Sequence, residues 1–422
     1  MVTKMNVLLF GISPHYSSLI RCFDKSNLAN KIYVWGENSL DCKISEKVEF
    51  IKGGSVEACR TFLKEKEIDF VIILQTPLYA KYVNIFKYNF SVPTLGVTRY
   101  WTQLESSKLF AKEFMQKYDL PCSDYFLIKS IKELENSILK FGLPLVIKDN
   151  TMQAGFGVHI CKTKKECIDY AKKLLKKDGF CIAEKYIEGK EVTLHTIWDG
   201  ETLLPLEPVK DYKRLENGDK GINTGSMGAY VPASLTMKEK EVMFEYVKKL
   251  AQAFKEAKPN FTGVFVSDLI FSNDKVYNLE FNMRPGTPEF EALIEHFDCD
   301  IFEVLYKTAI SKLKDVKISY KSGYTGAVNV VHKDYKKQIR NDKMKKVKIL
   351  KGFFSPDNNI KINTRISRIT EKNEVFVYPC MKVFTVIKND ILNPFSEIYK
   401  HISKLKDKNL YYRTDIGVDL QE

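Results

Sequence analysis

Asp268, Glu280 and Asn282 are the residues of this chain whose types and spacing most directly indicate chemistry. They lie in two apolar stretches joined by the polar turn 272–274, a pattern that predicts two adjacent strands. Glu280 and Asn282 are two residues apart and therefore leave the same face of one strand, while Asp268 lies on its partner. A carboxylate among apolar neighbours is costly to bury unless it is paired or bound to a cation. Three such oxygen ligands suit Mg²⁺, although a half-exposed hairpin with solvated carboxylates fits equally well.

A second candidate site lies in residues 144–158, where an apolar stretch ends at Lys148 and a loop with Gly155 and Gly157 follows. Glycines let backbone N–H groups approach a phosphate closely, and a lysine at the end of a strand adds a positive charge. The loop opens into another strand rather than a helix, which excludes a Walker loop and a dinucleotide fingerprint. On its own, the pattern is more typical of an ordinary hairpin with a glycine turn.

Residues 182–191 form a third candidate site, in which an apolar strand is followed by acidic residues around Gly189. Backbone groups of such a segment can pair with the edge of an adenine base, while a carboxylate accepts the ribose hydroxyls. Read alone, the segment is a weak indication of a nucleotide site.

The elements that must position these residues begin with an alternation of strands and helices. Apolar runs at 6–11, 31–35 and 69–75 predict strands, and stretches such as 56–66 predict the helices between them. Residues 1–103 are therefore predicted to form a doubly wound βαβ domain.

The rest of the chain is predicted to form two further domains. A helix over about 104–118 opens an α+β domain that continues to about residue 320. Residues 321–422 change to short strands and turns, which predict a small C-terminal β-rich domain. The fold class is therefore a combination of α/β and α+β, and we find no repeat or low-complexity linker between the domains.

Composition limits the functional class. The chain has 422 residues, of which 44% are hydrophobic, enough for several packed cores. Its N-terminus lacks a secretory pattern and no apolar run reaches the ~20 residues of a membrane span, so we expect a cytoplasmic protein. The nine cysteines form no C-x-x-C pair, so we expect them to be reduced residues of the core. The net charge is +13, but the sequence contains no signature of a nucleic-acid-binding module.

Taken together, the segments resemble the ATP-grasp superfamily and, within it, the phosphoribosylamine–glycine ligases (glycinamide ribonucleotide synthetases). The resemblance covers about 104–286 and reappears at the C-terminus. The most specific part is 211–230, where the order and spacing of charged residues and glycines match the family. The matching segments are LESSKLFAKEFMQKYDLP, PLVIKDNTMQAGFGV, IAEKYIEGKEV, DYKRLENGDKGINTGSMGAYVPA, NLEFNMRPGTPE and YYRTDIG.

The resemblance implies a role for each matching position. The implied ATP-binding residues are Lys108, Lys148, Gly155, Gly157, Glu184, Tyr186 and Glu191. The implied ligands of Mg²⁺, or of Mn²⁺ in its place, are Asp268, Glu280 and Asn282. The implied catalytic residues are Lys213 and Arg284. The implied substrate-binding residues are Gly11, His15, Asn223, Thr224, Gly225, Met227, Gly286 and Arg413.

Two of these residues have a second interpretation. His15 follows the first predicted strand, at the edge where ligands of such sheets bind, but a solvated loop histidine fits equally well. Arg413 has Asp415 two residues away, so a salt bridge that docks the C-terminus fits slightly better than a contact with substrate.

The chemistry implied by the resemblance is the activation of a carboxylate by ATP. Phosphoryl transfer gives an acyl phosphate, an amine attacks it, and an amide, ADP and phosphate are released. Because acyl phosphates hydrolyse, a lid must exclude water, and residues of about 122–187 are the expected lid. The expected partners are small-molecule carboxylates and amines, without nucleic acid or membrane, and the protein is expected to be a monomer or homodimer.

Three departures from the family pattern bear on the substrate. The loops 11–17 and 74–78 lack the family's glycine–arginine–glutamate–histidine and Gly-Pro-Glu sequences, and Phe156 stands where a lysine is usual. The first two changes fall on the domain that receives the amine. We therefore expect a ligase with an altered amine substrate, with a genuine phosphoribosylamine–glycine ligase as an almost equal alternative. A phosphotransferase of the same superfamily is less favoured, as is a non-catalytic ATP-binding protein.

Overall fold

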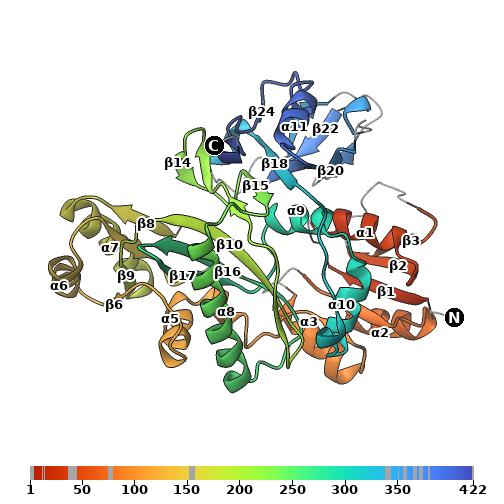
Figure 1. Ribbon diagram of the computed structural model, residues 1–422, viewed down its shortest axis with the longest axis horizontal. Coiled ribbons are helices and arrows are strands. Elements are labelled where there is room, and N and C mark those ends of the chain that lie inside the picture. Colours follow the sequence, from red (N-terminus) through yellow and green to blue (C-terminus); the bar gives the residue numbers. More distant parts are fainter. Residues whose placement is uncertain are drawn as a thin grey trace.

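The computed structural model of the chain describes residues 4–11, 13, 15–36, 45–74, 79–151, 157–337, 344–349, 351–354, 359–364, 368–369, 374–378 and 381–420. In Figure 1 the N-terminal segment, in red and orange, lies beside the yellow and green central segment, and the blue C-terminal segment lies above both in the view.

The N-terminal sheet is parallel throughout, in the order β3-β2-β1-β4-β5. Its strands and helices are β1 (Met5–Phe10), α1 (Tyr16–Lys25), β2 (Ala29–Gly36), β3 (Val48–Lys52), α2 (Val56–Glu65), β4 (Phe70–Ile72), α3 (Ala80–Asn84) with the π-helical turn Ile85–Asn89, and β5 (Thr94–Leu95). Val7 and Leu9 of β1 pack on the side of α1, whereas Leu8 and Phe10 pack on the side of α2 and α3. Helices therefore cover both faces, which confirms the predicted doubly wound layer.

The central segment contains two antiparallel four-stranded sheets, in the orders β11-β10-β16-β17 and β6-β9-β7-β8. The strands of the first are β10 (Lys190–Trp198), β11 (Leu203–Pro205), β16 (Gly263–Ser272) and β17 (Lys275–Asn282). Those of the second are β6 (Tyr125–Ile128), β7 (Leu145–Lys148), β8 (Val158–Cys161) and β9 (Cys181–Lys185). The helices are α4 (Gln103–Ser106), α5 (Lys108–Lys117), α6 (Ile131–Phe141), α7 (Lys164–Asp178) and α8 (Met237–Ala257). The second sheet has a small core of its own with α6 and α7.

The expected helix over 104–118 is two helices. Ser107 has an extended backbone between α4 and α5, and its side chain accepts a hydrogen bond from the Phe110 N–H. A serine that caps the free N–H groups of a new helix favours a break at that position. The break allows α5, which carries Lys108 and Lys112, to start in a new direction.

The C-terminal sheet has six strands: β12-β15-β18-β23-β20 in order, with β24 beside β18. Its strands are β12 (Lys210–Asp211), β15 (Gly228–Val231), β18 (Tyr324–His332), β20 (Lys361–Thr364), β23 (Lys382–Asp390) and β24 (Leu410–Tyr411). A hairpin is formed by β13 (Arg214–Glu216) and β14 (Lys220–Asn223), and a small sheet by β19 (Lys345–Lys348), β22 (Glu374–Val377) and β21 (Arg368–Ile369). The helix α11 (Phe395–Ile402) follows β23. Single 3-10 turns are formed by Leu313–Asp315, Lys333–Lys337, Lys351–Phe354 and Val418–Leu420. Because β12 and β15 precede residue 320, this sheet crosses the domain boundary expected from the sequence.

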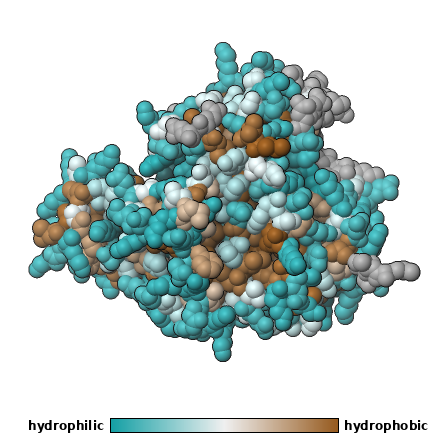
Figure 2. Space-filling model, viewed as in Figure 1, coloured by the Kyte–Doolittle hydropathy of each residue, from teal (hydrophilic) through white to brown (hydrophobic). Residues whose placement is uncertain are grey.

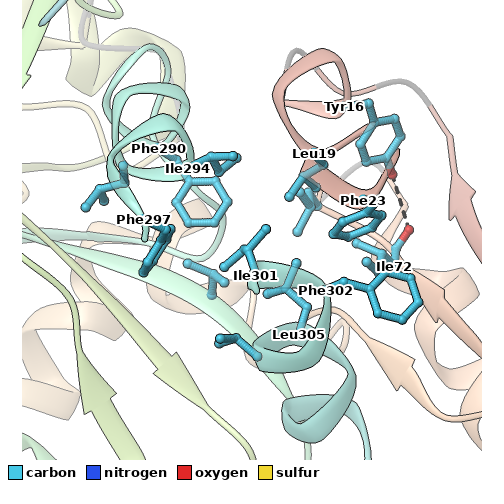
Figure 3. Packing of buried hydrophobic residues seen from close by; sticks show 14 of the residues in the cluster. Tyr16, Leu19, Phe23, Ile72, Phe290, Ile294, Phe297, Ile301, Phe302 and Leu305 are labelled. Atoms are coloured by element: carbon cyan, nitrogen blue, oxygen red, sulfur yellow. Dashed lines mark hydrogen bonds between the residues drawn. The ribbon is translucent and has the colours of Figure 1, made fainter. Parts of the chain in front are cut away.

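Two helices of the central segment, α9 (Glu289–His296) and α10 (Ile301–Ala309), pack against the N-terminal domain. Figure 3 shows Leu19 and Phe23 of α1 facing Ile294 of α9 and Phe302 of α10. The Phe23 and Phe302 rings meet edge to face, with centroids 4.9 Å apart. This shared core fixes α9, and the turn before it, relative to the N-terminal sheet.

The visible face in Figure 2 is largely polar, with apolar residues gathered toward its centre. Among the helices in the described part of the chain, none is both long and apolar enough to cross a membrane.

Candidate active site

A cavity of about 310 Å³ lies between the second central sheet and the β16–β17 hairpin. Val146 and Ile160 line it from one side, and Ile270 and Leu279 line it from the other. Apolar side chains on two facing sheets form a slot suited to a flat aromatic ring. Sequence reasoning missed these four residues, because an apolar residue that lines a ligand looks the same in the sequence as one that fills a core.

The predicted base and ribose residues lie along this slot. Tyr186 lines the cavity together with Ile187, and Glu191 lines it at the start of β10. Gly157 starts the turn into β8 and lines the smaller recess next to the cavity, whereas Gly155 and Phe156 lie outside the described residues.

A buried ion-pair network that includes Lys148 and Glu184 lines the slot. One oxygen of Glu184 is 3.0 Å from Lys148 Nζ, and the other is 3.2 Å from Lys112 Nζ. The Ser123 hydroxyl also donates to Glu184, at 2.5 Å. Burial alone would raise the pKa of Glu184, but the two lysines and Ser123 lower it to about 2. Glu184 is therefore an ionised partner of Lys148, and its carboxylate points toward the lysines.

Lys112 was not predicted from the sequence. It lies one helical turn after Lys108 on α5, so the two lysines share a face of the helix. The Lys108 ammonium donates to the Thr151 carbonyl at 2.8 Å, and burial lowers the pKa of Lys108. The i, i+4 spacing of the two lysines was the available signal.

The structure brings Asp268, Glu280 and Asn282 together as predicted. Asp268 lies directly across from Glu280 in the β16–β17 pairing, and the Asn282 amide donates to one Asp268 oxygen at 3.0 Å. The other Asp268 oxygen accepts from the Thr193 hydroxyl at 2.9 Å and from Lys213 Nζ at 3.3 Å. Burial raises the pKa of Asp268 to about 6, which Lys213 opposes.

These three residues fit a small divalent cation of the Mg²⁺ type. They offer two carboxylates and an amide oxygen, the ligand type such ions prefer, and leave positions for water and phosphate oxygens. Within the described residues there is no group of three or more His, Cys, Asp or Glu side chains placed to hold a metal, so a site made of acids and imidazoles alone is not found there.

Lys213 and Arg284, the two predicted catalytic residues, are each oriented by a buried carboxylate. Lys213 lies on the loop after β12, and its Nζ is 2.9 Å from Asp211, the last residue of that strand. Arg284 Nε donates to Glu105 at 3.0 Å, and Glu105 also accepts the Met283 N–H. Both cations line cavities that also contact Glu280.

The turn after β17 is held by two histidines. The Gly286 N–H donates to His195 Nε2 at 3.0 Å, and His15 Nε2 lies 3.3 Å from the Thr287 hydroxyl. Burial lowers the pKa of His195 to about 3, so its ring stays neutral and can accept this hydrogen bond. His15 is buried and meets the Phe290 ring edge to face, so the solvated-loop interpretation of His15 is wrong.

The other predicted substrate residues separate into two groups. Asn223 and Thr224 line the large cavity, and Gly225 follows them in the same loop. Met227 instead lies in a small apolar core with Leu215 and is fully buried there, so it supports the loop from behind. At the N-terminal sheet, Gly11 is buried beneath Tyr79.

Arg413 is a docking residue. Its guanidinium is 1% exposed, pairs with Asp415 and Asp219, and donates to the Arg214 carbonyl. These contacts fasten the C-terminal tail to the β13–β14 hairpin, and Arg214 of this hairpin lines the large cavity. The salt-bridge interpretation of Arg413 is therefore the one that the structure supports.

The chain is similar in sequence to a known protein family and to several known proteins. Residues 106–290 match the family described as phosphoribosylglycinamide synthetase, ATP-grasp (A) domain. A phosphoribosylamine–glycine ligase of Fusobacterium nucleatum is 28% identical over 98% of both chains. The human trifunctional purine biosynthetic protein adenosine-3 is 29% identical over 85% of this chain and 36% of its own length.

Solved structures agree on the fold. The phosphoribosylamine–glycine ligase of Thermotoga maritima superposes with a TM-score of 0.77 at 20% identity, covering 97% of this chain and 99% of that one. The biotin carboxylase domain of a Hydrogenobacter thermophilus 2-oxoglutarate carboxylase, in complex with MgADP, gives 0.70 at 14% identity, covering 97% and 92%. Residues 106–290 of the chain therefore match an ATP-grasp domain, and almost the whole chain is similar in sequence to phosphoribosylamine–glycine ligases.

Proposed function

We propose that this protein binds ATP with Mg²⁺, converts a small carboxylic acid into its acyl phosphate and transfers the acyl group to an amine. The observation that carries the proposal is the convergence of Lys148, Lys213 and the Asp268–Glu280–Asn282 group on one cavity with an apolar slot. Cations and oxygen ligands at the inner end of a base-sized slot suit a nucleoside triphosphate, whose charge lies at one end.

Each residue of the site has a task in this reaction. Lys108 and Lys148 neutralise phosphate oxygens, and Glu280 and Asn282, with Asp268, would hold the metal ion. When bound, Mg²⁺ supplies charge stabilisation to the phosphoryl group. Arg284, held by Glu105, orients the carboxylate of the acid. The neutral ring of His195 holds the Gly286 N–H in place, which keeps the turn next to Arg284 in one conformation.

The amine is proposed to differ from phosphoribosylamine, as the altered loops suggested. A Cβ atom placed on Gly11 would lie 2.8 Å from the Tyr79 ring, so this ring covers the end of β1. His15 is directed at Thr287 and Phe290 rather than at an open surface. An aromatic ring at this edge favours a smaller or less charged amine. The alternative, a phosphoribosylamine–glycine ligase of purine synthesis, is favoured by the relatives that match 98% of this chain.

The test is ADP release from ATP·Mg²⁺ with glycine and with phosphoribosylamine generated in situ from ribose 5-phosphate and ammonia. Turnover that requires both compounds would establish the alternative and exclude an altered amine. Turnover with glycine and another amine from a panel supports the proposal. ADP release that needs only one acceptor would indicate a phosphotransferase. A Glu280→Gln preparation controls for contaminating ATPases.

A further inference from the structure

Lys382 is a residue of the C-terminal domain that reaches into the acceptor side of the site. It opens β23, and its ammonium donates hydrogen bonds to the carbonyl oxygens of Gly225 and Thr287. Gly225 belongs to the loop after β14, and Thr287 to the turn between β17 and α9. One side chain therefore joins two loops that are separated in the sequence by β15, α8, β16 and β17.

Both loops carry residues of the site. The first follows Thr224, which lines the large cavity, and the second follows Arg284 and Gly286. Other contacts anchor each loop on its far side. The Thr224 N–H donates to the Lys213 carbonyl, and the Gly286 N–H donates to His195. With these anchors in place, the bridge through Lys382 sets the separation of the two loops.

The charges around Lys382 favour an ammonium at this position. Burial raises the pKa of Glu289 to about 8, and Asp211 adds to the rise, while Lys382 and Lys213 oppose it. Lys382 also contributes to the low pKa of Asp211, where burial acts in the opposite direction. A neutral side chain in place of Lys382 would leave the two carbonyls without their donor and the two acids with less compensating charge.

We propose that Lys382 is a positioning residue for the acyl acceptor side, and that the C-terminal domain completes this part of the site through it. The proposal deepens the proposed function, because it names a residue that sets the loop geometry for the acid and the amine. Lys382 acts through Gly225 and Thr287 and takes no part in phosphoryl transfer.

The first test needs no substrate. Amide hydrogen exchange is measured on Lys382→Met, Lys382→Arg and the control Lys388→Met, which removes a partly buried lysine from the same strand. In Lys382→Met, the exchange rate should rise about tenfold in the peptide covering 223–228 and in the peptide covering 285–290. It should stay unchanged in peptides covering 145–148 and 181–185. Lys382→Arg should restore part of the protection. Unchanged exchange in either loop, or an equal rise throughout the C-terminal domain, would overturn the proposal.

The second test uses turnover with the acid and amine identified above. Lys382→Met should raise the KM for the acid or the amine about tenfold and leave ADP binding, measured by calorimetry, as in the wild type. An equal loss of ADP binding would mean a general structural role, and the positioning role would be rejected. If no acid–amine pair gives turnover, the proposed function fails while the exchange experiment still decides the role of Lys382. If Lys382→Met does not fold, Lys382→Gln replaces it in both measurements.

Discussion

The nucleotide side and the acceptor side of this site are built in different ways. On the nucleotide side, Lys112, Lys148 and Glu184 form a buried ion-pair network within one central segment. On the acceptor side, His15 comes from the N-terminal domain and Lys382 from the C-terminal domain, and both contact the turn at Thr287. The first arrangement depends on one segment, whereas the second requires three domains to be docked correctly.

The bonds at the two sides differ in kind as well. The nucleotide side pairs full charges, while the turn with Gly286 and Thr287 on the acceptor side is held through backbone N–H and carbonyl groups by a neutral imidazole and an ammonium. Behind the acceptor turn, Arg21, Glu295 and Asn363 bond across all three domains, with Arg21 donating to both of the others. Changes on the nucleotide side should therefore act through buried charge, and changes on the acceptor side through geometry.

The largest effect is expected from Glu184→Gln. This change leaves Lys112 and Lys148 buried without a counter-charge, and breaking a buried pair in this way costs about 3–5 kcal/mol. The free energy of unfolding, measured by urea titration of the central segment's transition, should fall by this amount. A matched Glu135→Gln change removes an exposed ion pair with Lys164 and should have little effect. If the two variants lowered the free energy of unfolding equally, buried charge would not distinguish the nucleotide side from the acceptor side.

The next effect concerns the metal ligands. Glu280→Gln keeps the size of the side chain but removes a carboxylate from the proposed Mg²⁺ site, and should lower kcat/KM about 10²–10³-fold. The concentration of Mg²⁺ required for half-maximal activity should rise as well. A Glu280→Gln enzyme with unaltered Mg²⁺ dependence would contradict the assigned ligand set, whichever acid and amine are used.

A smaller effect on the acceptor side depends on pH. Burial lowers the pKa of His195 to about 3, so between pH 6.5 and pH 3 the unfolded chain binds a proton there that the folded protein does not. The contribution of His195 to the free energy of unfolding should therefore fall by about 2 kcal/mol as the pH drops from 7 to 5. His195→Gln should remove that part of the pH dependence. In both proteins, the lowered pKa of His296 (about 4) adds a slope of the same sign, and the raised pKa values of Glu289 and Asp268 add slopes of the opposite sign. The difference between the two pH profiles isolates the contribution of His195.

The smallest effect is expected from Asp219→Asn, which removes one partner of Arg413. The Asp219 side chain is 63% exposed, and ion pairs with an exposed partner contribute below about 1 kcal/mol. The melting temperature and the KM for ATP should change little. Asp415→Asn, which removes the less exposed partner and also the acceptor of the Gly218 N–H, should have the larger effect of the two.

Much of the nucleotide side could be predicted from the sequence. The two-residue spacing of Glu280 and Asn282 fixes their common face, and the short turn after Ser272 brings the strand with Asp268 alongside them. A register shift between Asp268 and Leu269 then sets Asp268 directly across from Glu280. The two parts that could not be predicted were Lys112 and the inward direction of Glu184. Each depends on how α5 approaches the second sheet, and no local pattern of residues encodes that approach.

The acceptor side was predicted in its residues and only in part in their roles. His15, Gly225, Gly286 and Arg413 were named from the sequence. The salt bridge that docks Arg413 was the favoured interpretation of that residue, whereas the burial of His15 against Phe290 was not foreseen. Lys382 was not named, because a lysine at the start of a strand in a lysine-rich chain has no distinguishing neighbours. The domain boundary at 320 was expected from a change of pattern, yet β15, which also pairs with β12, pairs across it with β18.

The sequence by itself determined the doubly wound layer, the paired strands with Asp268, Glu280 and Asn282, and the resemblance to the ATP-grasp ligases. The layer and the paired strands follow from periodicity and spacing, which act over a few residues at a time, whereas the resemblance rests on the segments that match the family. The tertiary structure alone decided which carboxylates face lysines, which histidines are buried, and that Lys382 joins two distant loops. Such contacts depend on the docking of whole domains, and their energies come from burial and desolvation that only the folded chain provides.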